Sequence, residues 1–330
     1  FYDCSSLAAI TIPDSVRTIE SSAFSGCSSL TEVEIPTGVS TIGSYAFSRC
    51  TSLTEMVIPE GVSSIAYGTF YNCTALRQVT LPGGLTEIGQ EAFENCSALE
   101  AIELPEKVTT IGASAFYGCK MLKQITLPDS LTEIGQSAFV NCASLQSVQL
   151  PDKLTSVGNY TFSGCKVLKR IDIPASVATI GKSAFSGCAK LTAITFGHRQ
   201  ENPLTIGVDA FNVGYYVDNV KTRIGVYSVR GIHPAIQGYS WNKRTVTYYN
   251  TETIPMEAIA IHAQDDAAEI EVGLPLTFVA ELTPFDTTDD PVWSINPDNS
   301  TGTAEITAEG VLTGLTPGIV TVRAAAGSDE

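Results

Sequence analysis

Nine cysteines recur at one constant interval, without exception: Cys4, Cys27, Cys50, Cys73, Cys96, Cys119, Cys142, Cys165 and Cys188. A phenylalanine lies three residues before each cysteine, and a leucine lies three residues after it. A fixed period between about 20 and 50 residues is typical of a solenoid, in which each repeat forms one coil. Because so short a repeat cannot bury a core alone, the coils must stack on one another.

One unit, residues 24–46, has the sequence FSGCSSLTEVEIPTGVSTIGSYA. In its first half, Val33 and Ile35 alternate with Glu32 and Glu34, which is the periodicity of a strand with one buried face. Pro36 ends this strand, because proline cannot donate a ladder hydrogen bond. Stacked units therefore predict a parallel sheet whose strands lie about 4.8 Å apart.

The second half of the unit returns to the core at Val39 and Ile42. Gly43 follows, and we expect it to supply a backbone conformation that other residues resist. The Ala46–Phe47 pair that opens the next coil predicts a short helical turn on the outer side. The resulting fold class is mainly β, a solenoid of 23-residue repeats.

The cysteine ladder admits three interpretations: disulfides, a metal site, or packing. Neighbouring positions would be close enough for a bridge, but equivalent side chains in a parallel stack point the same way and nine thiols cannot all pair. Metal sites need converging ligands, often as C-x-x-C pairs, and the sequence has no such pair. Cysteine is among the most buried residue types, so we predict reduced, buried packing thiols and no bound metal or cofactor.

The skeleton A-F-x-x-C-x-x-L-x-x-I-x-I-P recurs from residue 1 to about residue 191. It resembles the BspA-like leucine-rich repeats of bacterial surface proteins, also called the Treponema pallidum type. The resemblance implies a secreted or surface-displayed protein that contacts host molecules or other microbes, without implying one ligand. Because Phe1 falls inside a repeat, we expect the natural protein to extend further at its N-terminus.

The 23-residue period is broken after Phe196. The pair Ala210–Phe211 arrives three residues later than the period counted from Phe185 predicts, and glycine replaces the next cysteine. We expect an irregular cap from about residue 197 within a solenoid domain of residues 1–250, with strands at 226–229 and 245–249 and a helical turn near 234–239. Aromatic residues cluster there, either as cap packing or as a carbohydrate-stacking platform: Tyr215, Tyr216, Tyr239, Trp241, Tyr248 and Tyr249.

Residues 251–330 form a second predicted domain. Seven short apolar runs, at 258–262, 268–272, 276–282, 292–295, 304–306, 311–313 and 319–324, predict a small β-sandwich around Trp293. The runs LTPFDTTDDPVWS at 282–294 and AEGVLTGLTPGIVTV at 308–322 resemble the bacterial immunoglobulin-like group 2 domain. That resemblance implies a spacer or adhesive module.

The chain carries a net charge of −16, and residues 251–330 contribute 15 acidic residues against one basic residue. An acidic chain repels phosphate backbones, which argues against a nucleic-acid partner. The sequence has no apolar run of about 18 residues that would span a membrane. Asp286, Asp289, Asp290 and Asp298 are weighed as calcium ligands, but a solvated surface is the favoured interpretation, because they lack EF-hand spacing.

Catalytic motifs of the hydrolase, nucleotide-binding and zinc-protease types do not occur in the sequence. The three histidines are His198, His233 and His262, and each is interpreted as a surface or packing residue. A cysteine nucleophile would need an exposed, activated thiol, whereas these thiols are predicted to be buried. We therefore predict that the chain is not an enzyme.

Function is expected on the exposed face of the sheet, because solenoids bind partners through extended surfaces. Positions one, two and four after the repeat leucine point outward and grade from acidic to basic along the chain. The candidate binding residues are Glu32, Glu34, Glu55, Lys123, Gln124, Gln149, Lys169, Arg170 and Asp172.

These features lead to three hypotheses for function. The first is an extracellular or cell-surface bacterial adhesin-like module that binds a protein or glycan on host or neighbouring cells. The second is a structural stalk with no ligand of its own. The third is an accessory region of a larger secreted enzyme.

Overall fold

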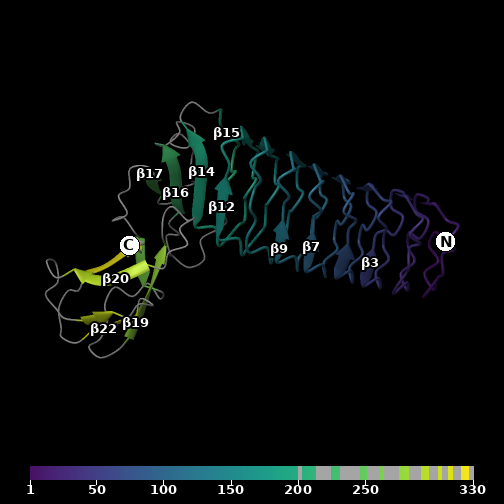
Figure 1. The fold of residues 1–330 in the computed structure, drawn as a ribbon, viewed down its shortest axis with the longest axis horizontal. Coiled ribbons are helices and arrows are strands. Elements are labelled where there is room, and N and C mark those ends of the chain that lie inside the picture. The colour runs from purple at the N-terminus through teal and green to yellow at the C-terminus, as the bar shows by residue number, and fades with distance from the viewer. Residues whose placement is uncertain are drawn as a thin grey trace. The chain divides into compact units, whose positions relative to one another are not determined.

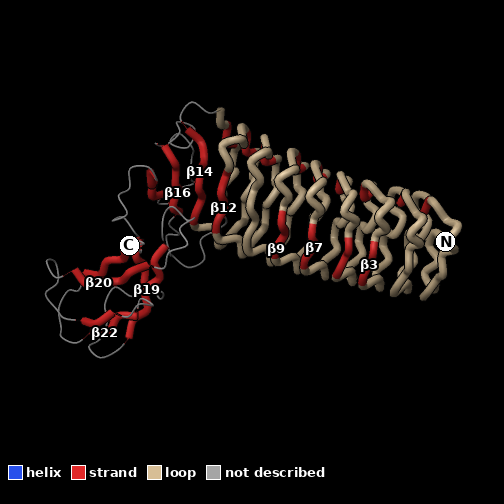
Figure 2. Tube along the Cα trace, in the orientation of Figure 1, coloured by secondary structure: helices blue, strands red, loops and turns tan. Residues whose placement is uncertain are grey.

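The computed structural model describes the backbone of residues 1–199 and 203–212, with side chains for 1–197 and 203–212. Beyond residue 212 it describes eight separate strands, β16 to β23. The chain divides into two compact units, Phe1–Tyr249 and Asn250–Glu330. The first of these contains the repeats, and its described residues include no helix (Figures 1 and 2).

Most coils of the solenoid carry two short strands, and equivalent strands stack into two columns (Figure 1). The first column follows the repeat leucine and contains β3 (Glu55–Val57), β5 (Gln78–Thr80), β7 (Ala101–Glu103), β9 (Gln124–Thr126), β12 (Arg170–Ile173) and β14 (Ala193–Arg199). The second column contains β1 (Thr18–Ile19), β2 (Thr41–Ile42), β4 (Ser64–Ile65), β6 (Glu87–Ile88), β8 (Thr110–Ile111), β10 (Glu133–Ile134), β11 (Ser156–Val157), β13 (Thr179–Ile180) and β15 (Thr205–Ile206).

The register of both columns follows the repeat. Ile19 pairs with Ile42, and Ile88 pairs with Ile111, in parallel and one full repeat apart. Single bridges between Thr11 and Glu34 and between Gln124 and Ser147 extend the first column where no full strand forms. The predicted parallel solenoid is confirmed, and its register places identical repeat positions side by side.

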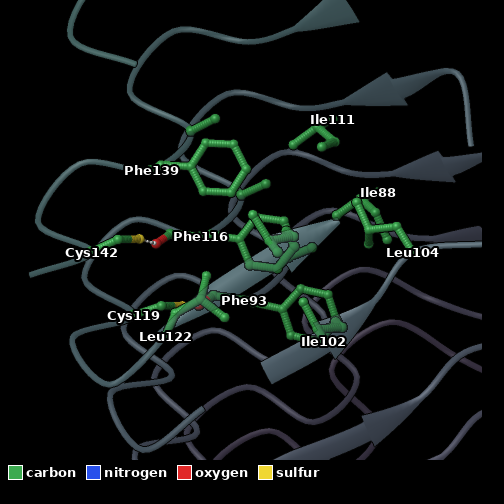
Figure 3. Packing of buried hydrophobic residues seen from close by; sticks show 14 of the residues in the cluster. Ile88, Phe93, Ile102, Leu104, Ile111, Phe116, Cys119, Leu122, Phe139 and Cys142 are labelled. Atoms are coloured by element: carbon green, nitrogen blue, oxygen red, sulfur yellow. Dashed lines mark hydrogen bonds between the residues drawn. The ribbon is translucent and has the colours of Figure 1, made fainter. Parts of the chain in front are cut away.

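Phenylalanine forms a continuous stack through the core (Figure 3). Ring centroids of successive coils lie 5.2–5.8 Å apart, with interplanar angles of 2–13°, from Phe1 through to Phe211. Leu122, Ile102 and Ile111 pack beside these rings and are buried. Since each aromatic ring buries a large apolar area, this stack is a main source of cohesion between coils.

The segment around Ala46–Phe47 is not the predicted helical turn. Phe47 N–H donates to the carbonyl of Thr69 in the next coil (2.9 Å), while Ser48 N–H donates back to Tyr45 (3.1 Å). Amide groups thus alternate between their own turn and the neighbouring coil. An α-helix would direct every amide four residues back along its own chain, so this alternation excludes one.

Left-handed backbone conformation at two positions per coil explains the alternation. Tyr45 and Arg49, five and one residues before Cys50, have φ of 56° and 58°. The position just before each cysteine is left-handed in every coil and holds Asp3, Gly26, Arg49, Asn72, Asn95, Gly118, Asn141, Gly164 and Gly187. Glycine, asparagine and aspartate tolerate this conformation best, so the sequence carried a signal against a helix.

Gly43 is also needed for a reason other than the predicted one. Its φ is not positive. Instead, a Cβ there would lie 2.9 Å from the carbonyl carbon of Glu20 and from Cα of Ser21 in the preceding coil. The glycine therefore permits close approach between backbones, and the same position is glycine in every later coil except at Ala66.

The three extra residues after Phe196 are accommodated between the two strands of that coil. Ile173 pairs with Phe196 at the usual spacing, whereas Ile180 pairs with Ile206. The sheet continues beyond the regular repeats through β16 (Ile224–Arg230), parallel to β14, and β17 (Val246–Asn250). The two strands predicted in the cap are thus present, whereas the helical turn near 234–239 lies outside the described residues.

The second unit contains antiparallel strands. One sheet has the order β18-β19-β22-β21 and the other pairs β20 with β23. The strands are β18 (Ala260–Ala263), β19 (Pro275–Glu281), β20 (Pro291–Asn296), β21 (Ala304–Ile306), β22 (Val311–Gly314) and β23 (Thr321–Ala326). They overlap six of the seven predicted runs, and the seventh, 268–272, lies outside the described residues.

Candidate functional site

All nine cysteines are free, and eight are buried. The thiol of each buried cysteine donates to the carbonyl oxygen of a phenylalanine in the preceding coil, at 3.0–3.4 Å. The predicted packing ladder is confirmed, with a hydrogen-bonding role that the spacing alone did not reveal. Cys4 differs from the prediction and is exposed, because no described coil packs against its outer side.

Burial keeps these thiols chemically inactive. It raises the pKa of Cys50 to about 12 and raises the pKa of Cys73, Cys96 and Cys119 well above the ordinary range. Since the thiolate is the nucleophile, a buried thiol of raised pKa is a poor one. No cluster of three or more histidine, cysteine, aspartate or glutamate side chains suited to a metal ion occurs in the described part of the chain.

The exposed face of the first strand column is the remaining candidate. In the coil of Leu30, the side chains of Thr31, Glu32 and Glu34 are exposed, whereas Val33 is buried. The same alternation recurs in the following coils because the strand period is two residues. Of the nine predicted binding residues, eight are exposed and Arg170 is half-buried.

Ion pairs modify the predicted gradient of charge. Lys123 Nζ lies 2.8 Å from Glu100 Oε2, and Arg170 Nε lies 3.1 Å from Asp172 Oδ1. The hydrogen bond from Lys123 lowers the pKa of the Glu100 carboxyl. Two of the predicted basic residues therefore already have acidic partners on the same face.

Three charged residues of this face were missed by the sequence analysis: Arg77, Glu100 and Glu103. They occupy the same offsets from the repeat leucine as the predicted residues, so the signal was available. With them included, the coils up to Leu99 present five carboxylates and one guanidinium. The later coils present three cations and one carboxylate, so the gradient holds but is interrupted at Arg77.

Several sequence predictions fall outside what the structure describes. The four weighed calcium ligands, His233 and the aromatic residues Tyr215, Tyr216, Tyr239 and Trp241 lie in segments that are not described. His198, Tyr248, Tyr249, His262 and Trp293 lie in described strands whose side chains are not described. Within the described residues, no helix has the length and apolar character needed to cross a membrane.

A profile of the BspA type leucine rich repeat region matches residues 1–121 and 86–218, in six copies. This chain belongs to that family. The match covers well over half of the sequence and ends at residue 218. The family is one of repeat regions and indicates no catalytic activity.

Solved structures of other bacterial leucine-rich repeat proteins are similar to the BspA-type chain. One is the Treponema pallidum leucine-rich repeat protein, at 30% identity over 56% of this chain and 78% of that one, with a TM-score of 0.41. Another is a leucine-rich repeat protein from Bacteroides ovatus, at 25% identity over 76% of this chain and 80% of that one, with a TM-score of 0.43.

A third solved structure is a leucine-rich cell-surface protein of Faecalibacterium prausnitzii. It is 29% identical, covers 66% of this chain and 79% of its own, and has a TM-score of 0.37. A search of curated proteins found no match.

Proposed function

We propose that this chain is a non-enzymatic binding region of a bacterial surface or secreted protein, with the solenoid contacting a protein or glycan ligand. The observation that carries the proposal is the exposed first strand column. There the buried positions repeat from coil to coil, whereas the exposed positions vary, as at Glu34, Val57 and Thr80. Packing requires the first pattern and leaves the second free for recognition.

Charge is the feature of this face most useful for recognition. Glu32, Glu34 and Glu55 lie at one end, and Lys169 lies at the other. A partner with complementary charges would be steered into one orientation along the stack. The immunoglobulin-like domain proposed for residues 251–330 would act as a spacer.

Charge reversal tests the face directly. The variant carries Glu32→Lys, Glu34→Lys, Lys169→Glu and Arg170→Glu, and binding of the full chain to immobilised host matrix proteins and to host cells is measured. We expect affinity to fall roughly tenfold or more, because like charges would then face each other. The matched control carries Glu106→Lys, Asp152→Lys, Lys107→Glu and Lys153→Glu, four exposed turn residues with the same total change in charge.

Equal binding by the two variants and the unaltered chain would remove the adhesive face from consideration and favour the structural stalk. Equal loss in both variants would show that binding does not depend on this face in particular, and would contradict the proposal. The proposal requires loss in the first variant alone.

A further inference from the structure

Tyrosine and glutamate are concentrated in the outer turns of three consecutive coils. The positions six, five and two residues before the cysteine are often serine, as at Ser21, Ser22, Ser25, Ser44, Ser48, Ser114, Ser137, Ser163, Ser183 and Ser186. Between Cys27 and Cys96, tyrosine and glutamate occupy five of these positions: Tyr45, Tyr67, Tyr71, Glu91 and Glu94. In the other coils, tyrosine occupies these positions singly, at Tyr2, Tyr117 and Tyr160. Since serine satisfies the fold elsewhere, packing does not require the larger side chains.

Stacking brings the three tyrosines together. Tyr45 N–H donates to the carbonyl of Tyr67 in the next coil at 2.9 Å, which aligns the two turns. The rings of Tyr45 and Tyr67 have centroids 4.9 Å apart at 89°, and those of Tyr45 and Tyr71 are 6.2 Å apart at 83°. The ring of Tyr45 therefore stands perpendicular to both neighbouring rings.

Gly68 makes room for this arrangement. A Cβ at Gly68 would lie 2.6 Å from Cδ1 of Tyr45, so any side chain there would displace the ring. Gly68 has φ of 57°, and Ser22, Ser114 and Ser137 hold 54–59° at the equivalent position. The backbone conformation at residue 68 would therefore accept serine. Glycine is needed there because it leaves space for the ring of Tyr45.

The following coil adds two carboxylates. Asn72 N–H donates to the carbonyl of Glu94 at 2.8 Å, which places Glu94 beside the turn that carries Tyr71. Hydrogen bonds to the side chains of Tyr45 and Glu91 raise the pKa of the Tyr67 hydroxyl above its ordinary range. Burial and the nearby Glu91 raise the pKa of the Glu94 carboxyl. Neither glutamate takes part in an ion pair among the described residues.

We propose that Tyr45, Tyr67, Tyr71, Glu91 and Glu94, here called the tyrosine–glutamate cluster, bind an organic cation. The ligand class is the side chain of arginine or lysine, or a quaternary ammonium group. Perpendicular rings present a negative face and polarised hydroxyls to a cation, and the face attracts positive charge. The adjacent carboxylates of Glu91 and Glu94 have no cationic partner among the described residues, and such a ligand would supply one. All five side chains are half-buried and remain accessible, and the site is separate from the first strand column.

The test uses calorimetric titration of the full chain with capped pentapeptides that carry one central arginine, lysine or citrulline, and with tetramethylammonium. Citrulline keeps the shape of arginine without its charge. We expect saturable binding of the cations and roughly tenfold weaker binding of the citrulline peptide. Tighter binding of arginine than of tetramethylammonium would indicate a basic protein segment as the ligand, and the reverse order would indicate a small amine.

Gly68→Ser tests the geometry without altering a proposed contact residue. We expect it to weaken arginine binding by roughly 3- to 30-fold, the range for loss of a cation–π contact, while leaving thermal stability nearly unchanged. Tyr160→Ala is the matched control, because Tyr160 occupies the position equivalent to Tyr45 but aligns with Lys182 in the next coil. The proposal is overturned if citrulline binds as tightly as arginine, if Gly68→Ser binds normally, or if no cation binds at millimolar concentration.

Discussion

The thiol of Cys119 donates a hydrogen bond of 3.2 Å to the carbonyl oxygen of Phe93, which lies one coil earlier in the stack. The same carbonyl also accepts the N–H of Cys96 within its own coil, at 3.1 Å. Each phenylalanine carbonyl in the ladder is thus shared between two coils. The cysteine ladder therefore joins neighbouring coils at the turn, while the phenylalanine rings join them in the core.

Loss of one cysteine thiol and its hydrogen bond should destabilise the solenoid. We expect Cys119→Ala to lower the free energy of unfolding by about 1–2 kcal/mol, because it removes a buried thiol and its hydrogen bond while the carbonyl keeps its second donor. Urea unfolding followed by circular dichroism measures this change. Cys4→Ala is the control, and because Cys4 is exposed its effect should stay within about 0.5 kcal/mol. If both variants changed the free energy of unfolding equally, the Cys119 hydrogen bond would contribute nothing to stability.

Thiol labelling should distinguish one cysteine from the other eight. In the native protein we expect iodoacetamide to modify Cys4, which is exposed, and in denaturant to modify all nine cysteines. The physical reason is that the eight buried thiols are inaccessible to the reagent. Mass spectrometry of peptides after timed labelling gives the rate for each site. Native labelling of Cys96 at the rate of Cys4 would contradict the ladder.

Stability should fall at alkaline pH. The folded-state pKa is raised to about 12 at Cys50 and is also raised at Cys73 and Cys96, whereas an unfolded thiol ionises near pH 8.5. The thiols therefore contribute stability that is fully present below pH 8.5 and is lost as pH rises toward the folded-state pKa values. Each contributes a slope of about 1.4 kcal/mol per pH unit.

The matched measurement compares the free energy of unfolding of the unaltered chain and of Cys96→Ala between pH 8.5 and 10. Because tyrosine ionisation is common to both proteins, the difference in slope isolates one thiol. We expect the variant to be less sensitive to pH by about 1.4 kcal/mol per unit. Identical slopes would mean that the thiol ionises equally in both states.

Close approach of backbones should make one glycine hard to replace. A Cβ at Gly112 would lie 2.6 Å from the carbonyl carbon of Gly89, so we expect Gly112→Ala to cost about 1–3 kcal/mol of unfolding free energy. Gly83→Ala is the control, since a Cβ there meets nothing within 4 Å. Thermal and urea unfolding of both variants measures the difference, and a neutral Gly112→Ala would contradict the close contact.

Local periodicity was enough to predict the core but not the turns. Phe116 and Leu122 recur at fixed offsets, and any stacking of equal units buries them together. The turn at Ala46–Phe47 was wrongly predicted to be helical because small and apolar residues there fit a helix as well. The deciding feature was the left-handed backbone at Tyr45 and Arg49. These two residue types seldom adopt it, so the only signal lay in the asparagines and glycines at the position of Arg49 in other coils.

The same contrast applies to the candidate sites. The exposed positions of the strand column followed from alternation along the chain, and their exposure at Glu32 and Glu34 agrees with the structure. The tyrosine–glutamate cluster was missed because it combines the turns of three coils. Tyr45 and Tyr67 belong to different coils, and only the hydrogen-bonded stacking of their turns brings the rings together.

The sequence by itself determined the coil length, the buried side chains and the parallel stacking, because a repeat of constant length allows identical positions to meet only in one register. The tertiary structure decided how neighbouring coils contact one another. It showed the thiol that donates to a phenylalanine carbonyl, the glycine that allows two backbones to approach closely, and the tyrosine rings that pack at right angles. These contacts depend on distances between atoms of different coils, which periodicity along one chain does not specify.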